Sequence, residues 1–211
     1  MSLRLEAIGF GKIEEENGLA SALSLIARYS TESSAKDLIC KPLDNCTVRL
    51  GLDRDAKPES LHVWLDSPLQ PLLFGAWRPD LGLDAHCATC MDGAPVSPLY
   101  VSLDRQLDEP VSERIAFAEL SGFCTSFQMS KESASSAGLE RVTSDGACHL
   151  VCVLLGARKV MNKFTNTEVW TGSVWLPGAI LPFACLEPVE WNPGTVLSGS
   201  VKIHARLADL L

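Results

Sequence analysis

The 211-residue chain lacks the features that mark several common classes of protein. Its longest uncharged apolar stretches, such as residues 148–156, are about half of the roughly 20 residues that a membrane-spanning helix needs. We therefore expect no membrane span. Glycine-rich phosphate loops are also missing, because the sequence GFGK at residues 9–12 has the spacing of neither a P-loop nor a dinucleotide fingerprint.

Positive charge and histidine are both scarce. The chain has 18 basic against 26 acidic residues, and its formal net charge is −8. This balance argues against a surface that binds nucleic acid along the whole chain, so we expect no nucleic-acid partner. With only four histidines, the sequence also contains no complete set of residues for a known catalytic mechanism.

The first 18 residues, MSLRLEAIGFGKIEEENG, carry several charges and lack the apolar core of a secretory signal. The chain nevertheless contains eight cysteines. Without export, these thiols would be buried hydrophobes, metal ligands or nucleophiles in a reducing compartment. We therefore expect a cytoplasmic protein.

Alternation of apolar and polar residues is the strongest structural signal. It occurs in TVRLGL (47–52), SLHVWLD (60–66) and LYVSLD (99–104), and the last third of the chain is rich in similar segments. By contrast, NGLASALSLIARYS (17–30) has the apolar stripe of an amphipathic helix. The predicted fold is mainly β, an antiparallel sandwich or barrel of about nine strands with this one N-terminal helix packed on it. An α+β fold is the alternative.

Domain organisation follows from length and composition. A chain of 211 residues suits a single β-rich domain spanning residues 1–211. The serine-rich segment 130–146 is small and polar, which predicts a loop and the best candidate for an internal boundary. Residues 67–98 contain five prolines, a density that argues against a regular helix or a central strand and predicts an irregular excursion. Since that segment also carries apolar residues, we expect it to contact a partner.

The sequence HCATCMDG at residues 86–93 holds a Cys-x-x-Cys pair. Such a pair can place two thiolates on one zinc ion, so His86, Cys87 and Cys90 are the candidate metal ligands. A closed zinc site needs four ligands, and the chain has no second Cys-x-x-Cys. A plain turn with partly buried thiols is therefore the favoured interpretation. No cofactor is expected, and zinc is the one alternative.

Three polar or aromatic residues, His62, Trp64 and Asp66, share the outward face of one predicted strand. They would form the wall of a ligand pocket if the sheet curls, or an ordinary solvated face if it does not. Lys202, His204 and Arg206 form a similar basic stripe, which is most simply solvated. Other aromatic residues are candidate anchors for a ligand or partner, namely Phe74, Trp77, Trp170 and Trp175.

Two functions fit these features. The favoured one is a non-catalytic β-rich subunit or adaptor that binds another protein, or a second copy of itself, through the apolar segment 67–98 and exposed tryptophans. The alternative is a small zinc- or thiol-dependent enzyme that acts on a small molecule near Cys87 and Cys90.

Overall fold

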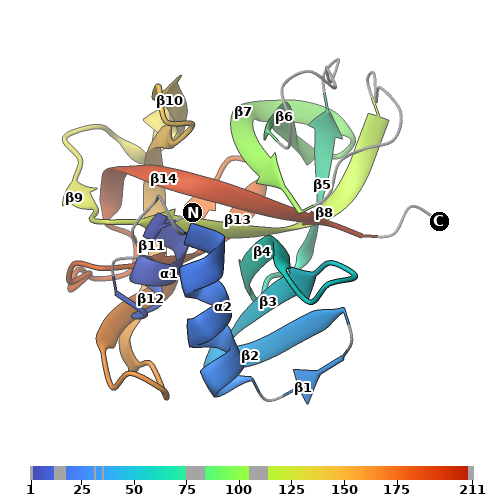
Figure 1. The fold of residues 1–211 in the computed structure, drawn as a ribbon. Helices are drawn as coiled ribbons and strands as arrows, with labels where there is room; N and C mark the ends of the chain where they lie inside the picture. Colours follow the sequence, from blue (N-terminus) through green and yellow to red (C-terminus); the bar gives the residue numbers. More distant parts are fainter. Residues whose placement is uncertain are drawn as a thin grey trace.

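A computed structural model describes residues 2–11, 18–30, 32–34, 36–74, 84–104 and 114–208. The prediction of a mainly β protein with an N-terminal helix is confirmed (Figure 1). Within the described residues, two short α-helices, α1 (Ser2–Ala7) and α2 (Gly18–Tyr29), accompany fourteen strands. None of the described helices has the length and apolar character to cross a membrane.

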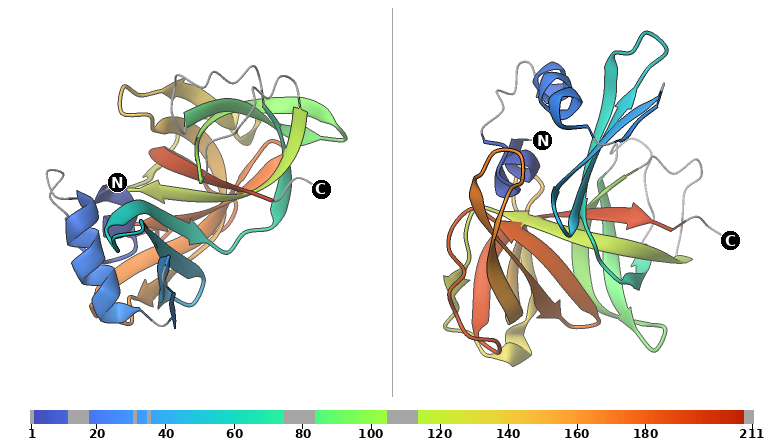
Figure 2. Two further views of the ribbon diagram at one scale, coloured as in Figure 1. Left: turned by 45° about the vertical axis from the view of Figure 1, so that its right-hand side comes forward. Right: turned by 90° about the horizontal axis from the view of Figure 1, so that it is seen from below.

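The first four strands form a small antiparallel sheet in chain order. These strands are β1 (Glu32–Ser33), β2 (Asp37–Leu43), β3 (Cys46–Leu52) and β4 (Pro58–Leu65). Alternation along β4 buries Leu61, Val63 and Leu65 and leaves His62 and Trp64 half-buried. The small sheet and both helices lie to one side of the larger sheet (Figure 2).

The remaining strands build a large sheet that closes into a barrel. They are β5 (Leu69–Phe74), β6 (Asp84–Met91), β7 (Ala94–Leu103), β8 (Arg114–Cys124), β9 (Gln128–Met129), β10 (Gly138–Val142), β11 (Cys148–Met161), β12 (Glu168–Leu176), β13 (Ala179–Cys185) and β14 (Val196–Leu207). Eight of them form a ring in the order β11–β12–β13–β8–β5–β6–β7–β14, which the pairing of β14 with β11 closes. Most neighbours are antiparallel, but β13–β8 and β14–β7 are parallel.

One pairing crosses this ring. Strands β8 and β14 are antiparallel neighbours, with Ala118 opposite Leu207 and Phe123 opposite Lys202. The short strand β9 continues the same edge of β14, where Met129 lies opposite Leu197. The β8–β14 ribbon is therefore a wall shared by two smaller rings, one containing β11–β13 and the other containing β5–β7 (Figure 1).

Two hydrophobic cores result. The barrel core fills the inside of the ring and includes Phe74, Leu150 and Phe183. The second core lies between the outside of the ring and the small sheet with its helices, and it contains Phe123 of β8 and Ile26 of α2 among other residues. Because successive residues of a strand point to opposite faces, one strand such as β8 supplies both cores.

The prediction of an irregular excursion over residues 67–98 is wrong, and this also explains why about nine strands was an underestimate. The segment holds β5, β6 and the first part of β7. The three prolines of these strands lie where the strand has one paired neighbour only: Pro71 is opposite Phe117, Pro95 is opposite Cys90, and Pro98 is opposite Ala88. A proline at such a position removes no ladder hydrogen bond on the open edge. Residues 75–83 lie outside the described part.

The serine-rich segment 130–146 contains a short 3-10 helix, η3 (Ala134–Ser136), and strand β10, which pairs with β11. Part of the expected loop is thus joined to the barrel. The division of the chain into domains stays a prediction.

Gly122 lies in the β8–β14 ribbon, opposite both Phe183 and Ile203. A Cβ atom at this position would come within 2.9 Å of Val201 Cγ1. We predict that Gly122→Ala lowers the free energy of unfolding by about 1–3 kcal/mol, because a stiff buried neighbour has to move. Urea unfolding measures this loss. Gly156→Ala is the matched control in the same sheet, since its Cβ meets nothing within 4 Å. Equal stability of the two variants would contradict the prediction.

Candidate functional site

A cleft of about 470 Å³ opens where the small sheet meets the barrel. We call it the junction cleft. Its lining comes from β2, β3, β4, β14 and the residue after β7, and consists of Asp37, Ile39, Arg49, His62, Trp64, Asp104 and Arg206. The predicted outward face of β4 is thus one wall of a cavity, although only two of its three residues take part.

Asp66 does not join His62 and Trp64. Strand β4 ends at Leu65, and the backbone N–H of Asp66 donates to the carbonyl of Asn45 at 2.9 Å. Asp66 and Asn45 instead line a separate open pocket of about 530 Å³ over β11–β13. Alternation alone placed Asp66 on the same face, but the strand ends before that register applies.

The charged groups of the junction cleft hold one another in place. Arg49 donates two hydrogen bonds to Asp37, at 2.8 and 3.0 Å. The guanidinium of Arg206 lies 4.8 Å from the centre of the Trp64 ring and forms an ion pair with Glu119 of β8. Such stacking orients the cation as well as attracting it.

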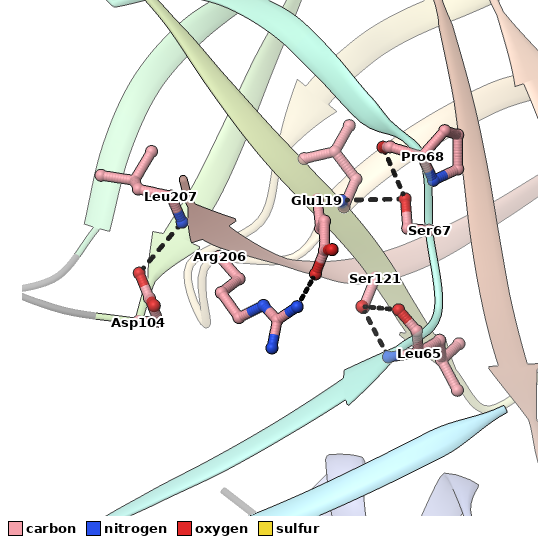
Figure 3. A network of polar contacts seen from close by, with 9 residues as sticks. Leu65, Ser67, Pro68, Asp104, Glu119, Ser121, Arg206 and Leu207 are labelled. Carbon is pink, nitrogen blue, oxygen red and sulfur yellow. Dashed lines mark hydrogen bonds and ion pairs between the residues drawn. The ribbon is translucent and has the colours of Figure 1, made fainter. Parts of the chain in front are cut away.

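Polar contacts also anchor β4 to the barrel beside the cleft (Figure 3). The buried hydroxyl of Ser121 accepts the backbone N–H of Leu65 at 2.8 Å. Asp104 accepts the N–H of Leu207 at 3.2 Å, at the far end of β14. These two contacts fix the end of β4 and the end of β14 beside the cleft.

His204 lies under the cleft, and its interpretation as part of a solvated stripe is wrong. It is 2% exposed, and its ring centre is 6.1 Å from that of His62. Neither of its ring nitrogens has a hydrogen-bond partner among the described residues. Burial, with smaller contributions from Arg4 and His62, lowers the pKa of His204 to about 3, and only the backbone of Ser102 acts in the opposite direction.

The Cys-x-x-Cys motif lies on strand β6, not in a turn; the turn follows at Asp92 and Gly93. His86 is exposed with its ring 4.7 Å from that of Tyr100, whereas Cys87 points into the barrel core. Cys90 is buried after a bulge. Burial raises the pKa of the Cys87 thiol, which disfavours the thiolate needed for metal binding or attack.

No group of three or more histidine, cysteine or acidic side chains among the described residues is arranged to hold a metal. The zinc hypothesis stays a prediction. The aromatic candidates are spread over the molecule: Phe74 is buried in the barrel core, Trp170 is half-buried, and Trp175 is 38% exposed on β12. Trp77 lies outside the described residues.

An exposed apolar surface that the sequence interpretation missed covers the outside of β5 and β8. We call it the β5–β8 face, made of Leu69, Pro71, Leu73, Ile115 and Phe117. Phe117 lies opposite Pro71, and Ile115 lies opposite Leu73, so the two strands carry one apolar row. Leu69 and Phe117 are each 54% exposed. The segment LQPLLF (69–74) is apolar on both faces apart from Gln70, so no alternation of apolar and polar residues marks its outward face.

Comparison with known proteins gives no relative: no family model matches the chain, and no curated protein or solved structure matches it. The fold therefore defines the class by itself. The protein is a closed eight-stranded β-barrel with a four-stranded sheet at its side.

His204 predicts an unusual dependence of stability on pH. Its pKa in the folded protein lies below the ordinary 6.5 of an unfolded histidine. Above pH 6.5 the imidazole is neutral in both states and has no effect, but as pH falls from 6.5 toward 3 only the unfolded state gains the proton, so the folded state loses stability. At about pH 4.5 the loss amounts to about 2–3 kcal/mol. We expect the free energy of unfolding of the wild type to fall more steeply between pH 7 and 4.5 than that of His204→Leu. Parallel curves in urea titrations would refute this account.

The zinc hypothesis has a direct test. With Cys87 buried and no third ligand grouped with it in the described residues, we expect purified protein to carry less than about a tenth of an equivalent of zinc. Chelator treatment should leave thermal unfolding unchanged. Stoichiometric zinc in elemental analysis, lost in Cys87→Ser, would reverse this expectation.

Proposed function

We propose that the protein is a β-rich binding subunit that assembles with another protein chain through the β5–β8 face. The observation that carries the proposal is the register of the exposed apolar side chains. Because Phe117 and Ile115 stand beside Pro71 and Leu73, they form one continuous surface rather than scattered exposures. Contiguous apolar patches on soluble proteins commonly mark interaction sites.

A second copy of this chain is the occupant that we infer. A twofold axis brings the same surface of two subunits together, so the surface must be complementary to itself. The β5–β8 face contains no charged side chain among the residues that define it, so two copies meet there without like-charge repulsion. The ion pair between Glu119 and Arg206 lies on the next outward position of β8 and supplies a polar rim.

This proposal moves the interface from where the sequence placed it. The apolar residues of segment 67–98 still contribute, but from the outside of strand β5, and β8 supplies the other half. The tryptophans contribute less, because Trp175 belongs to β12 on the other side of the β8–β14 ribbon. The enzyme near Cys87 and Cys90 is less well supported, because both thiols are buried.

Sedimentation equilibrium tests the assembly. We expect the wild type to approach twice the monomer mass at protein concentrations between about 1 and 100 µM, the range in which micromolar dimers form. Ile115→Thr combined with Phe117→Thr should raise the dissociation constant at least about tenfold, because it removes central apolar contacts while threonine keeps strand propensity.

The matched control is Leu155→Thr combined with Ile180→Thr. Those residues are 44% and 39% exposed in the same large sheet but lie outside the β5–β8 face. The control should assemble as the wild type does. A wild type that stays monomeric throughout the range, or equal weakening by both double variants, would overturn the proposal.

A further inference from the structure

Away from the junction cleft, Glu140, His149 and Ser200 lie in a row on neighbouring strands, each in polar contact with the next; we call them the relay. The carboxylate of Glu140 on β10 lies 3.3 Å from Nε2 of His149 on β11. The other ring nitrogen of His149, Nδ1, lies 3.2 Å from Oγ of Ser200 on β14. Acid, histidine and serine in this order are the arrangement that activates a serine hydroxyl as a nucleophile.

The strand register produces this order. His149 and Ser200 lie directly opposite each other in the β11–β14 pair, and both alternate with buried residues, Cys148 and Leu150 on one strand and Val201 on the other. Strand β10 has an irregularity between Leu139 and Arg141, and the residue between them is Glu140. Bulges of this kind redirect a side chain, and they are frequent beside active sites.

The carboxylate of Glu140 determines how the histidine can act. An ionised carboxylate only accepts hydrogen bonds, so the neutral imidazole places its N–H on Nε2. Nδ1 then carries the lone pair and accepts the hydroxyl hydrogen of Ser200. The contact of 3.2 Å is within the range of a resting serine–histidine pair.

A pocket of about 230 Å³ adjoins Ser200 and His149. Its other walls carry hydroxyl and amide groups from Thr125, Ser126, Gln128 and Ser198. These groups can donate hydrogen bonds to a substrate oxygen that becomes negatively charged. Ser200 itself is exposed, so a substrate reaches it without opening the barrel.

We propose that this pocket is an acyl-transfer site that hydrolyses small esters, an activity beyond the assembly role above. Ser200 Oγ bonds to the carbonyl carbon while its proton passes to His149 Nδ1. The bond to the alkoxide then breaks, and the alkoxide takes that proton and leaves as alcohol. A water oxygen then bonds to the acyl carbon while one of its protons passes to His149 Nδ1. The bond from that carbon to Ser200 Oγ breaks, Oγ takes the proton, and the carboxylic acid leaves. Glu140 is a positioning residue, because it acts through His149.

Covalent labelling with diisopropyl fluorophosphate, followed by peptide mass mapping, tests the proposal on the full chain. We expect one label, on Ser200, and none in Ser200→Ala. The matched control is Ser136→Ala, which removes an exposed serine of η3 that is not part of the pocket lining. It should be labelled as fast as the wild type.

Glu140→Gln separates positioning from a structural role. It should lower the limiting rate of labelling by about 10²-fold while the reagent concentration for half-maximal rate stays the same, because the pocket is intact. Steady hydrolysis of p-nitrophenyl acetate should fall in parallel. The proposal is overturned if Ser200 is unlabelled in folded wild type, or if His149→Asn with an unchanged circular dichroism spectrum is labelled at the wild-type rate.

Discussion

The pairing of β8 with β14 is the interaction on which the rest of the structure depends. This ribbon separates the barrel into two rings, so each ring needs it to close. Its inner face contributes Leu120 and Val201 to the barrel core. Its outer face carries Ser121, which holds β4, and Arg206, which lines the junction cleft. A change in the ribbon would therefore disturb both cores and the cleft together.

Hydrophobic periodicity correctly predicts those strands and the helix whose own residues alternate in burial. The alternation at 47–52, 60–66 and 99–104 corresponds to β3, β4 and β7, and the apolar stripe at 17–30 corresponds to α2. The proline density of residues 67–98 argues against strands, yet β5 and β7 hold their prolines, because the effect of a strand proline depends on whether its edge is paired. Strand order is a non-local property. Nothing within residues 196–207 indicates that β14 has partners in β7, β8, β9 and β11.

The same limit applies to the candidate sites. Alternation correctly placed His62 and Trp64 on one face, but it also placed His204 on a polar face. That histidine is buried where β14 lies against β4, β7 and β8, and no local pattern reports such contacts. The relay joins His149 to Ser200 across 51 positions, and it depends on an irregularity in β10 that the serine-rich composition concealed. In the Cys-x-x-Cys segment, the residue types are those of a zinc-binding turn. The segment is a strand instead, so His86 and Cys87 point to opposite faces of the sheet.

The reactivity of the cysteines toward thiol reagents depends on which part of the molecule opens. All eight are buried as free thiols, so a thiol reagent in water meets none of them in the folded state. Cys40 and Cys46 belong to the second core, and five others belong to the barrel core, namely Cys87, Cys124, Cys148, Cys152 and Cys185. Because a buried thiol reacts only when its surroundings separate, the rate at each cysteine reports the opening of its own core. The chain thus carries a built-in probe that distinguishes detachment of the small sheet from rupture of the barrel.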